Sequence, residues 1–79
     1  MYKLEVEWII DGDRVSDEST ANEVKVRYDL AHGYATIVMG YHVDGGILNK
    51  CWTICEPYQV ATLKDEHGNV IGQFSGARA

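Results

Sequence analysis

The segment from Val24 to Tyr41 constrains the fold of this chain most, because Gly33 separates two apolar patterns within it. Before Gly33, apolar residues alternate with charged ones as in a half-buried strand, at Val24, Val26, Tyr28 and Leu30. After Gly33, a second alternating set contains Ala35, Ile37, Met39, Tyr41 and Val43. The fold is all-β if Gly33 belongs to a hairpin turn, and mixed α+β if Gly33 ends a helix.

Local signals also favour a helix over about residues 20–32. Thr20-Ala21-Asn22-Glu23 fits a capping box, in which the first and last side chains each accept a hydrogen bond from the other residue's backbone N–H. Glu23 and Arg27 have the spacing of a favourable i,i+4 pair. Gly33 fits the left-handed residue that commonly follows a helix.

The register across Gly33 distinguishes the two interpretations. A three-residue turn over 31–33 would pair Leu30 with Tyr34. The apolar face of 34–43 would then lie opposite Lys25 and Arg27, which a sheet with one buried face tolerates poorly. We therefore predict an α+β fold with one helix over about 20–32, and keep an all-β fold with a strand over 23–30 as the alternative.

The rest of the chain is typical of an antiparallel sheet. Residues 2–10 alternate as a half-buried strand, Asp11-Gly12-Asp13 indicates a turn, and residues 16–20 are polar enough for a connector. Further strands are predicted at about 34–43, 47–55, 58–64 and 69–74. Residues 1–79 then form a single small domain, with the helix packed on one face of the sheet.

Length and composition limit the core. A chain of 79 residues with 46% hydrophobic content forms one domain that buries about 60% of its unfolded surface. Association is a common way for so small a domain to bury more apolar area. Trp8, Trp52 and five tyrosines supply aromatic surface for such contacts, so a homodimer is one expectation.

The charge balance argues against direct binding of nucleic acid. Seven basic residues stand against 12 acidic ones, a net charge of −5, whereas binding a phosphate backbone depends on cations that neutralise it. An acidic surface instead favours a protein partner with a basic surface. The acidic residues that would form this surface are Glu5, Glu7, Asp11, Asp13, Asp17 and Glu18.

One stretch resembles, in part, the signature strand of the RNA recognition motif. His32-Gly33-Tyr34-Ala35 follows the basic, glycine, aromatic, alanine order of that signature, and the stretch continues to Met39. The resemblance implies an RNA-binding strand around Gly33–Met39. Thr36 and Met39 stand where the signature has stacking aromatic residues, and the element order differs, so RNA binding is a lesser alternative.

The two cysteines do not indicate a disulfide or a metal site. On a strand, Cys51 and Cys55 lie about 13 Å apart, whereas a disulfide requires α-carbons within about 7 Å. The same separation prevents them from joining His42 and either His32 or His67 around one zinc ion. We therefore expect reduced thiols, in keeping with a cytoplasmic protein, and neither a metal nor a cofactor.

Catalytic and calcium-binding patterns are also weak. Catalysis by either cysteine would require His42 and an orienting acid in a pocket that a small domain can hardly form. Glu5 and Glu7 share a strand face that is expected to be solvated, and unperturbed carboxyls are poor general acids. A calcium loop starting at Asp11 would need an oxygen ligand and a glycine where Val15 and Ser16 stand.

Together these patterns predict a small acidic protein-interaction module that is not an enzyme. A more specific hypothesis is a phage or mobile-element inhibitor or accessory factor that binds a basic surface of a nucleic-acid-handling protein. The alternative is a structural subunit that assembles through exposed aromatics. No apolar run is long enough for a membrane span, so no membrane partner is expected. The predicted partner-binding residues are Glu5, Glu7, Asp11, Asp13, Asp17, Glu18, Trp8 and Trp52.

Overall fold

The computed structural model describes residues 1–29, 31, 33–55 and 58–76. In these residues the chain forms strands and no helix. The strands are β1 (Tyr2–Ile10), β2 (Asp13–Ala21), β3 (Glu23–Asp29), β4 (Tyr34–Val43), β5 (Gly46–Ile54), β6 (Val60–Lys64) and β7 (Val70–Ser75).

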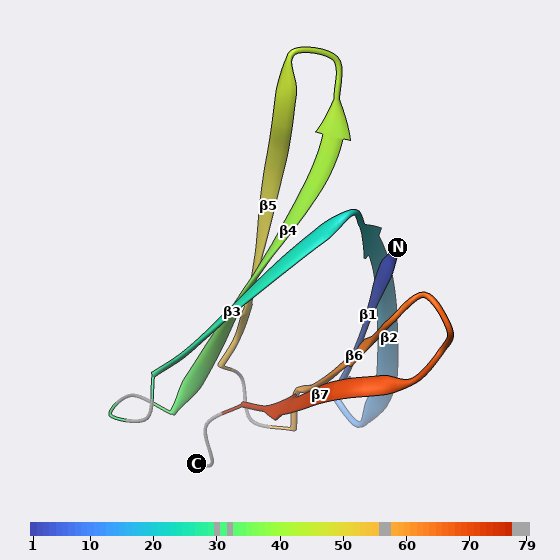
Figure 1. Cartoon of the computed structure of the whole chain (residues 1–79). Coiled ribbons are helices and arrows are strands. Elements are labelled where there is room, and N and C mark those ends of the chain that lie inside the picture. The colour runs from blue at the N-terminus through green and yellow to red at the C-terminus, as the bar shows by residue number, and fades with distance from the viewer. Residues whose placement is uncertain (30, 32, 56–57, 77–79) are drawn as a thin grey trace.

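The strands form two antiparallel sheets (Figure 1). Sheet A has four strands in the order β2-β1-β6-β7, and sheet B has three in the order β3-β4-β5. The inner face of each sheet, which faces the other sheet, supplies side chains to one core. Its fully or almost fully buried members are Leu4, Val6, Ala21, Ala35, Ile37, Met39, Ile54, Ala61 and Leu63.

The prediction of an α+β fold with a helix over about 20–32 is wrong, and the all-β alternative fits. Residues 23–29 form strand β3, which pairs with β4 along its whole length. Asp29 pairs with Tyr34, so four positions separate the paired residues, whereas the register argument for the helix assumed a three-residue turn. Its Gly33 has a φ of 70° and donates its N–H to the Asp29 carbonyl at 2.8 Å.

The one-residue difference in register reverses the argument that favoured the helix. Val26 lies directly opposite Ile37, and the charged residues of β3 face the opposite side of the sheet. The apolar sides of the two strands therefore coincide. Because β3 lies at an edge of sheet B, its apolar face is only partly covered: Val26 is 42% exposed.

The expected polar connector after Asp11-Gly12-Asp13 is also wrong, because residues 13–21 form β2. Asp11 and Gly12 have φ values of 51° and 83°, typical of the tight turn that joins two antiparallel strands. β2 then pairs with β1 from Ile10–Asp13 to Tyr2–Ala21. Its polar residues suit a sheet edge, where little of a strand is buried.

The other predicted strands are close to the structure. β1 and β4 begin and end where predicted, whereas β5, β6 and β7 differ by one or two residues. The predicted break at Glu56-Pro57 lies outside the described residues. The hairpin of β4 and β5 projects beyond the rest of the molecule (Figure 1), and Val43, Ile47 and Leu48 on this hairpin are each about half exposed.

Asn22 connects the two sheets at a corner between β2 and β3. Its N–H donates to the Gly40 carbonyl at 2.9 Å, and its Oδ1 accepts a 2.8 Å hydrogen bond from the His42 N–H. Three residues before Asn22, the Ser19 hydroxyl on β2 hydrogen-bonds at 2.7 Å with the Tyr41 hydroxyl on β4, between the two sheets.

The turn between β6 and β7 is organised by Asp65. Its Oδ1 accepts N–H hydrogen bonds from His67 and Asn69, both at 2.9 Å. These bonds, that of Asn69 foremost, stabilise the carboxylate and lower the pKa of Asp65 below its ordinary value. The ionised form of Asp65 therefore stabilises the folded chain.

The hydrogen bond between the sheets gives a first prediction. Tyr41→Phe should lower the free energy of unfolding by about 0.5–1.5 kcal/mol, because it removes a half-buried hydroxyl partner. Ser19→Ala should act on the same bond, so the double variant should lose less than the sum of the single losses. Urea denaturation measures these values. The matched control is Tyr28→Phe on the 51% exposed Tyr28, and an equal loss in both Tyr→Phe variants would contradict the assignment.

A second prediction concerns acid. Because the pKa of Asp65 is lowered on folding, its contribution is complete above its unfolded pKa and disappears as the pH falls through its folded pKa. The wild-type chain should therefore lose more stability between about pH 6 and about pH 3 than Asp65→Asn, which has no carboxyl to protonate at this position. Urea denaturation at the two pH values measures the difference. If Asp65→Asn loses as much stability between the two pH values as the wild-type chain does, this role of Asp65 is refuted.

Candidate interaction surface

The β1–β2 hairpin carries most of the negative charge of the chain. Residues 2–21 include six acidic and two basic residues, a net charge of −4 out of −5 for the whole chain. The remaining residues contain six acidic and five basic side chains, so they contribute only −1. Folding β2 back onto β1 gathers the predicted acidic residues on this hairpin.

The acidic side chains occupy both faces of the hairpin. Glu5 and Glu18 lie directly opposite each other on the outer face, and Glu7 follows on the same side of β1. Asp17 lies opposite the buried Val6 on the other face, yet Asp17 is exposed because β2 is an edge strand. Asp13 closes the turn that contains Asp11, and both are exposed.

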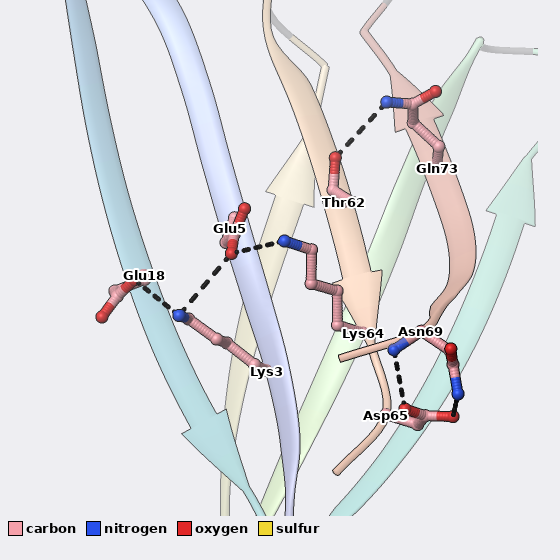
Figure 2. A network of polar contacts seen from close by, with 8 residues as sticks. All are labelled: Lys3, Glu5, Glu18, Thr62, Lys64, Asp65, Asn69 and Gln73. Atoms are coloured by element: carbon pink, nitrogen blue, oxygen red, sulfur yellow. Dashed lines mark hydrogen bonds and ion pairs between the residues drawn. The ribbon is translucent and has the colours of Figure 1, made fainter. Parts of the chain in front are cut away.

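Two lysines neutralise part of the outer face (Figure 2). Lys3 Nζ lies 3.2 Å from a Glu18 carboxylate oxygen and 3.6 Å from Glu5, and Lys64 Nζ of β6 lies 3.0 Å from the same Glu5 oxygen. The hydrogen bond from Lys64 is the main cause that lowers the pKa of Glu5. The pKa of Lys3 is raised, chiefly by its hydrogen bond with Glu18.

The other acidic residues of the hairpin are not engaged in this way. Among the described residues, no cationic group lies within 4.0 Å of the carboxylates of Glu7, Asp11, Asp13 or Asp17. A depression of about 430 Å³ lies over the middle of the hairpin, lined by Glu5, Val6, Glu7, Ser16, Asp17 and Glu18. Glu7 in this lining has no lysine beside it among the described residues, and its carboxylate suits a lysine or arginine side chain from a partner.

The two predicted tryptophans, Trp8 and Trp52, are not exposed side chains of this acidic surface. Trp8 lies on β1 but on its inner face, where it is half-buried against the core. Trp52 packs against the same core from β5 in sheet B. The acidic residues are therefore brought together, whereas the predicted aromatic contribution is directed mainly into the core.

The other residues considered for chemistry are scattered. Cys51 and Cys55 are free and exposed, and His42 lies near Glu23, with 3.8 Å between Nε2 and Oε1. His32 lies outside the described residues. Within the described part of the chain, no three His, Cys, Asp or Glu residues are grouped closely enough to hold a metal ion.

The strand that resembles an RNA-binding signature is the central strand of sheet B. Ala35, Ile37 and Met39 have no exposed surface, and Thr36 and Val38 of the opposite face are half-buried. The stretch therefore contributes mainly to the core and to the pairing of three strands. The described residues include no helix long and apolar enough to cross a membrane.

The sequence patterns did not reveal the lysine contacts or that the β4–β5 hairpin projects from the rest of the molecule. Lys3 and Lys64 are 61 positions apart in the sequence, and the two meet at Glu5 only because β6 pairs with β1. The turn at Asp11-Gly12 was predicted, but not its consequence, since such a turn is expected to return the chain as a second strand.

Comparison with known proteins adds no relative. No protein-family model matches this chain, and no curated protein or solved structure is significantly similar to it.

Proposed function

We propose that this chain is a non-catalytic protein-interaction module whose acidic β1–β2 hairpin binds a basic surface on another protein. The observation that supports this most is the net charge of −4 on residues 2–21. Four of the six acids are free of ion pairs with the described residues, so they are available to a partner. Such a concentration of charge accelerates encounter with a basic surface and selects against acidic ones.

The partner class follows from where large basic surfaces occur. Proteins that handle nucleic acids carry clustered lysine and arginine residues that neutralise phosphates. An acidic hairpin competes for the same cations, so the module acts as an inhibitor or accessory factor, by analogy of size and charge with small phage and mobile-element proteins that often do so. The free thiols of Cys51 and Cys55 agree with a cytoplasmic setting.

A second candidate function is assembly into a homo-oligomer, for which the projecting β4–β5 hairpin is the supporting observation. Val43, Ile47 and Leu48 leave about half of their surface exposed there. The predicted anchors Trp8 and Trp52 are half-buried in the core, so aliphatic side chains and backbone would make most of the contacts.

The charge hypothesis predicts the behaviour of two matched variants. Glu7→Lys with Asp13→Lys alters two exposed residues of the acidic hairpin, whereas Asp44→Lys with Glu66→Lys alters two exposed turn residues elsewhere. Both change the net charge from −5 to −1. The first should weaken binding to a partner captured from native extract by at least about tenfold, and the second should not.

The measurement is titration of each variant into the purified partner at several salt concentrations. Wild-type affinity should fall as salt rises, and a short DNA duplex should compete for the basic surface of the partner. Circular dichroism verifies that each variant is folded. Equal affinity of the two charge variants, or binding unaffected by both salt and DNA, would refute the proposal.

A further inference from the structure

Three of the four sheet edges carry features that discourage pairing with another strand. β2 has four charged residues, Asp13, Arg14, Asp17 and Glu18, and β3 has another four, Glu23, Lys25, Arg27 and Asp29. β7 has only six residues and pairs with β6 through a register irregularity at Leu63/Lys64. Charges, short length and irregular pairing are the usual means of protecting an edge.

The fourth edge, β5, lacks this protection. It has nine residues and a single charged one, Lys50. The Lys50 ammonium lies 5.7 Å from the centre of the Tyr41 ring on β4, so its charge is held over its own sheet. The strand therefore presents a long, nearly uncharged row of backbone donors and acceptors on the side that faces away from β4.

We propose that two copies of this chain pair through β5, antiparallel about a two-fold axis at Cys51. The three-stranded sheets then join into one continuous sheet of six strands. The pairing is closed, because each copy uses the same edge, as in most soluble homodimers. Backbone hydrogen bonds between the two β5 strands provide affinity, and the side chains set the register.

The sequence of β5 fits this register. Matching the inner faces of the two sheets requires pairs of residues whose numbers are both even or both odd. With the axis at Cys51, Leu48 faces the partner's Ile54, and Lys50 faces the partner's Trp52. An axis at Lys50 would place two ammonium groups directly opposite each other, which is destabilising.

The charge distribution permits this association. The acidic hairpin belongs to sheet A, whereas residues 22–79 carry a net charge of only −1. Two copies that meet at β5 therefore avoid bringing their most acidic strands into direct pairing. The β5 interface and the acidic hairpin are separate surfaces, so either proposal can fail without the other.

The first test is sedimentation velocity over a range of protein concentrations. Wild-type chain should form a dimer, and Cys51→Lys should weaken it by at least about tenfold, because it sets two like charges opposite each other at the axis. The matched control, Ser75→Lys, adds a lysine at an exposed residue of the β7 edge and should dimerise as wild type. A wild-type chain that stays monomeric, or a Cys51→Lys chain that dimerises as wild type, would overturn the proposal.

The second test reads the register with a short bismaleimide, which adds to two nearby thiols. Directly paired residues have α-carbons about 4.5–5.5 Å apart, so Cys55→Ser, which retains Cys51, should give a covalent dimer. Cys51→Ser should not, because the two Cys55 residues would lie about 26 Å apart along the strands. Cross-linking through Cys55 alone, or growth into species larger than a dimer, would refute the two-fold pairing.

Discussion

The two sheets depend on β4, because this strand pairs on both sides and also fills the core. β3 and β5 both use it as their partner, and Ala35, Ile37 and Met39 are completely buried between the sheets. The same strand accepts the corner hydrogen bond of Asn22 at Gly40. Its regular alternation therefore satisfies backbone pairing, core packing and the junction of the sheets together.

The sequence revealed those parts of the fold in which a side-chain period determines the structure. β1 and β4 have one strongly apolar face, and their limits were predicted correctly. β2 was missed because an edge strand buries few residues, so polarity there resembles a loop. β3 was misjudged because a turn longer by one residue exchanges the two faces of a strand.

The candidate surface was predictable in its charge but not in its geometry. Composition indicated an acidic face, yet only the pairing of β2 with β1 brings Glu5 and Glu18 together. The contact of Lys64 with Glu5 requires β6, which no local pattern places beside β1. The half-burial of Trp8 and Trp52 likewise follows from the position of the second sheet, which single strands do not specify.

The position of β6 between β1 and β7 has a consequence for the order of assembly. β1 with β2, and β3 with β4 and β5, are neighbours in sequence and close over short loops. Sheet A cannot be completed until residues 60–64 are available to pair with β1. Until then the acidic hairpin lacks the third strand of sheet A, and a two-stranded ribbon is at best marginally stable on its own in water. The acidic hairpin thus gains its third strand only after residue 64 has been made.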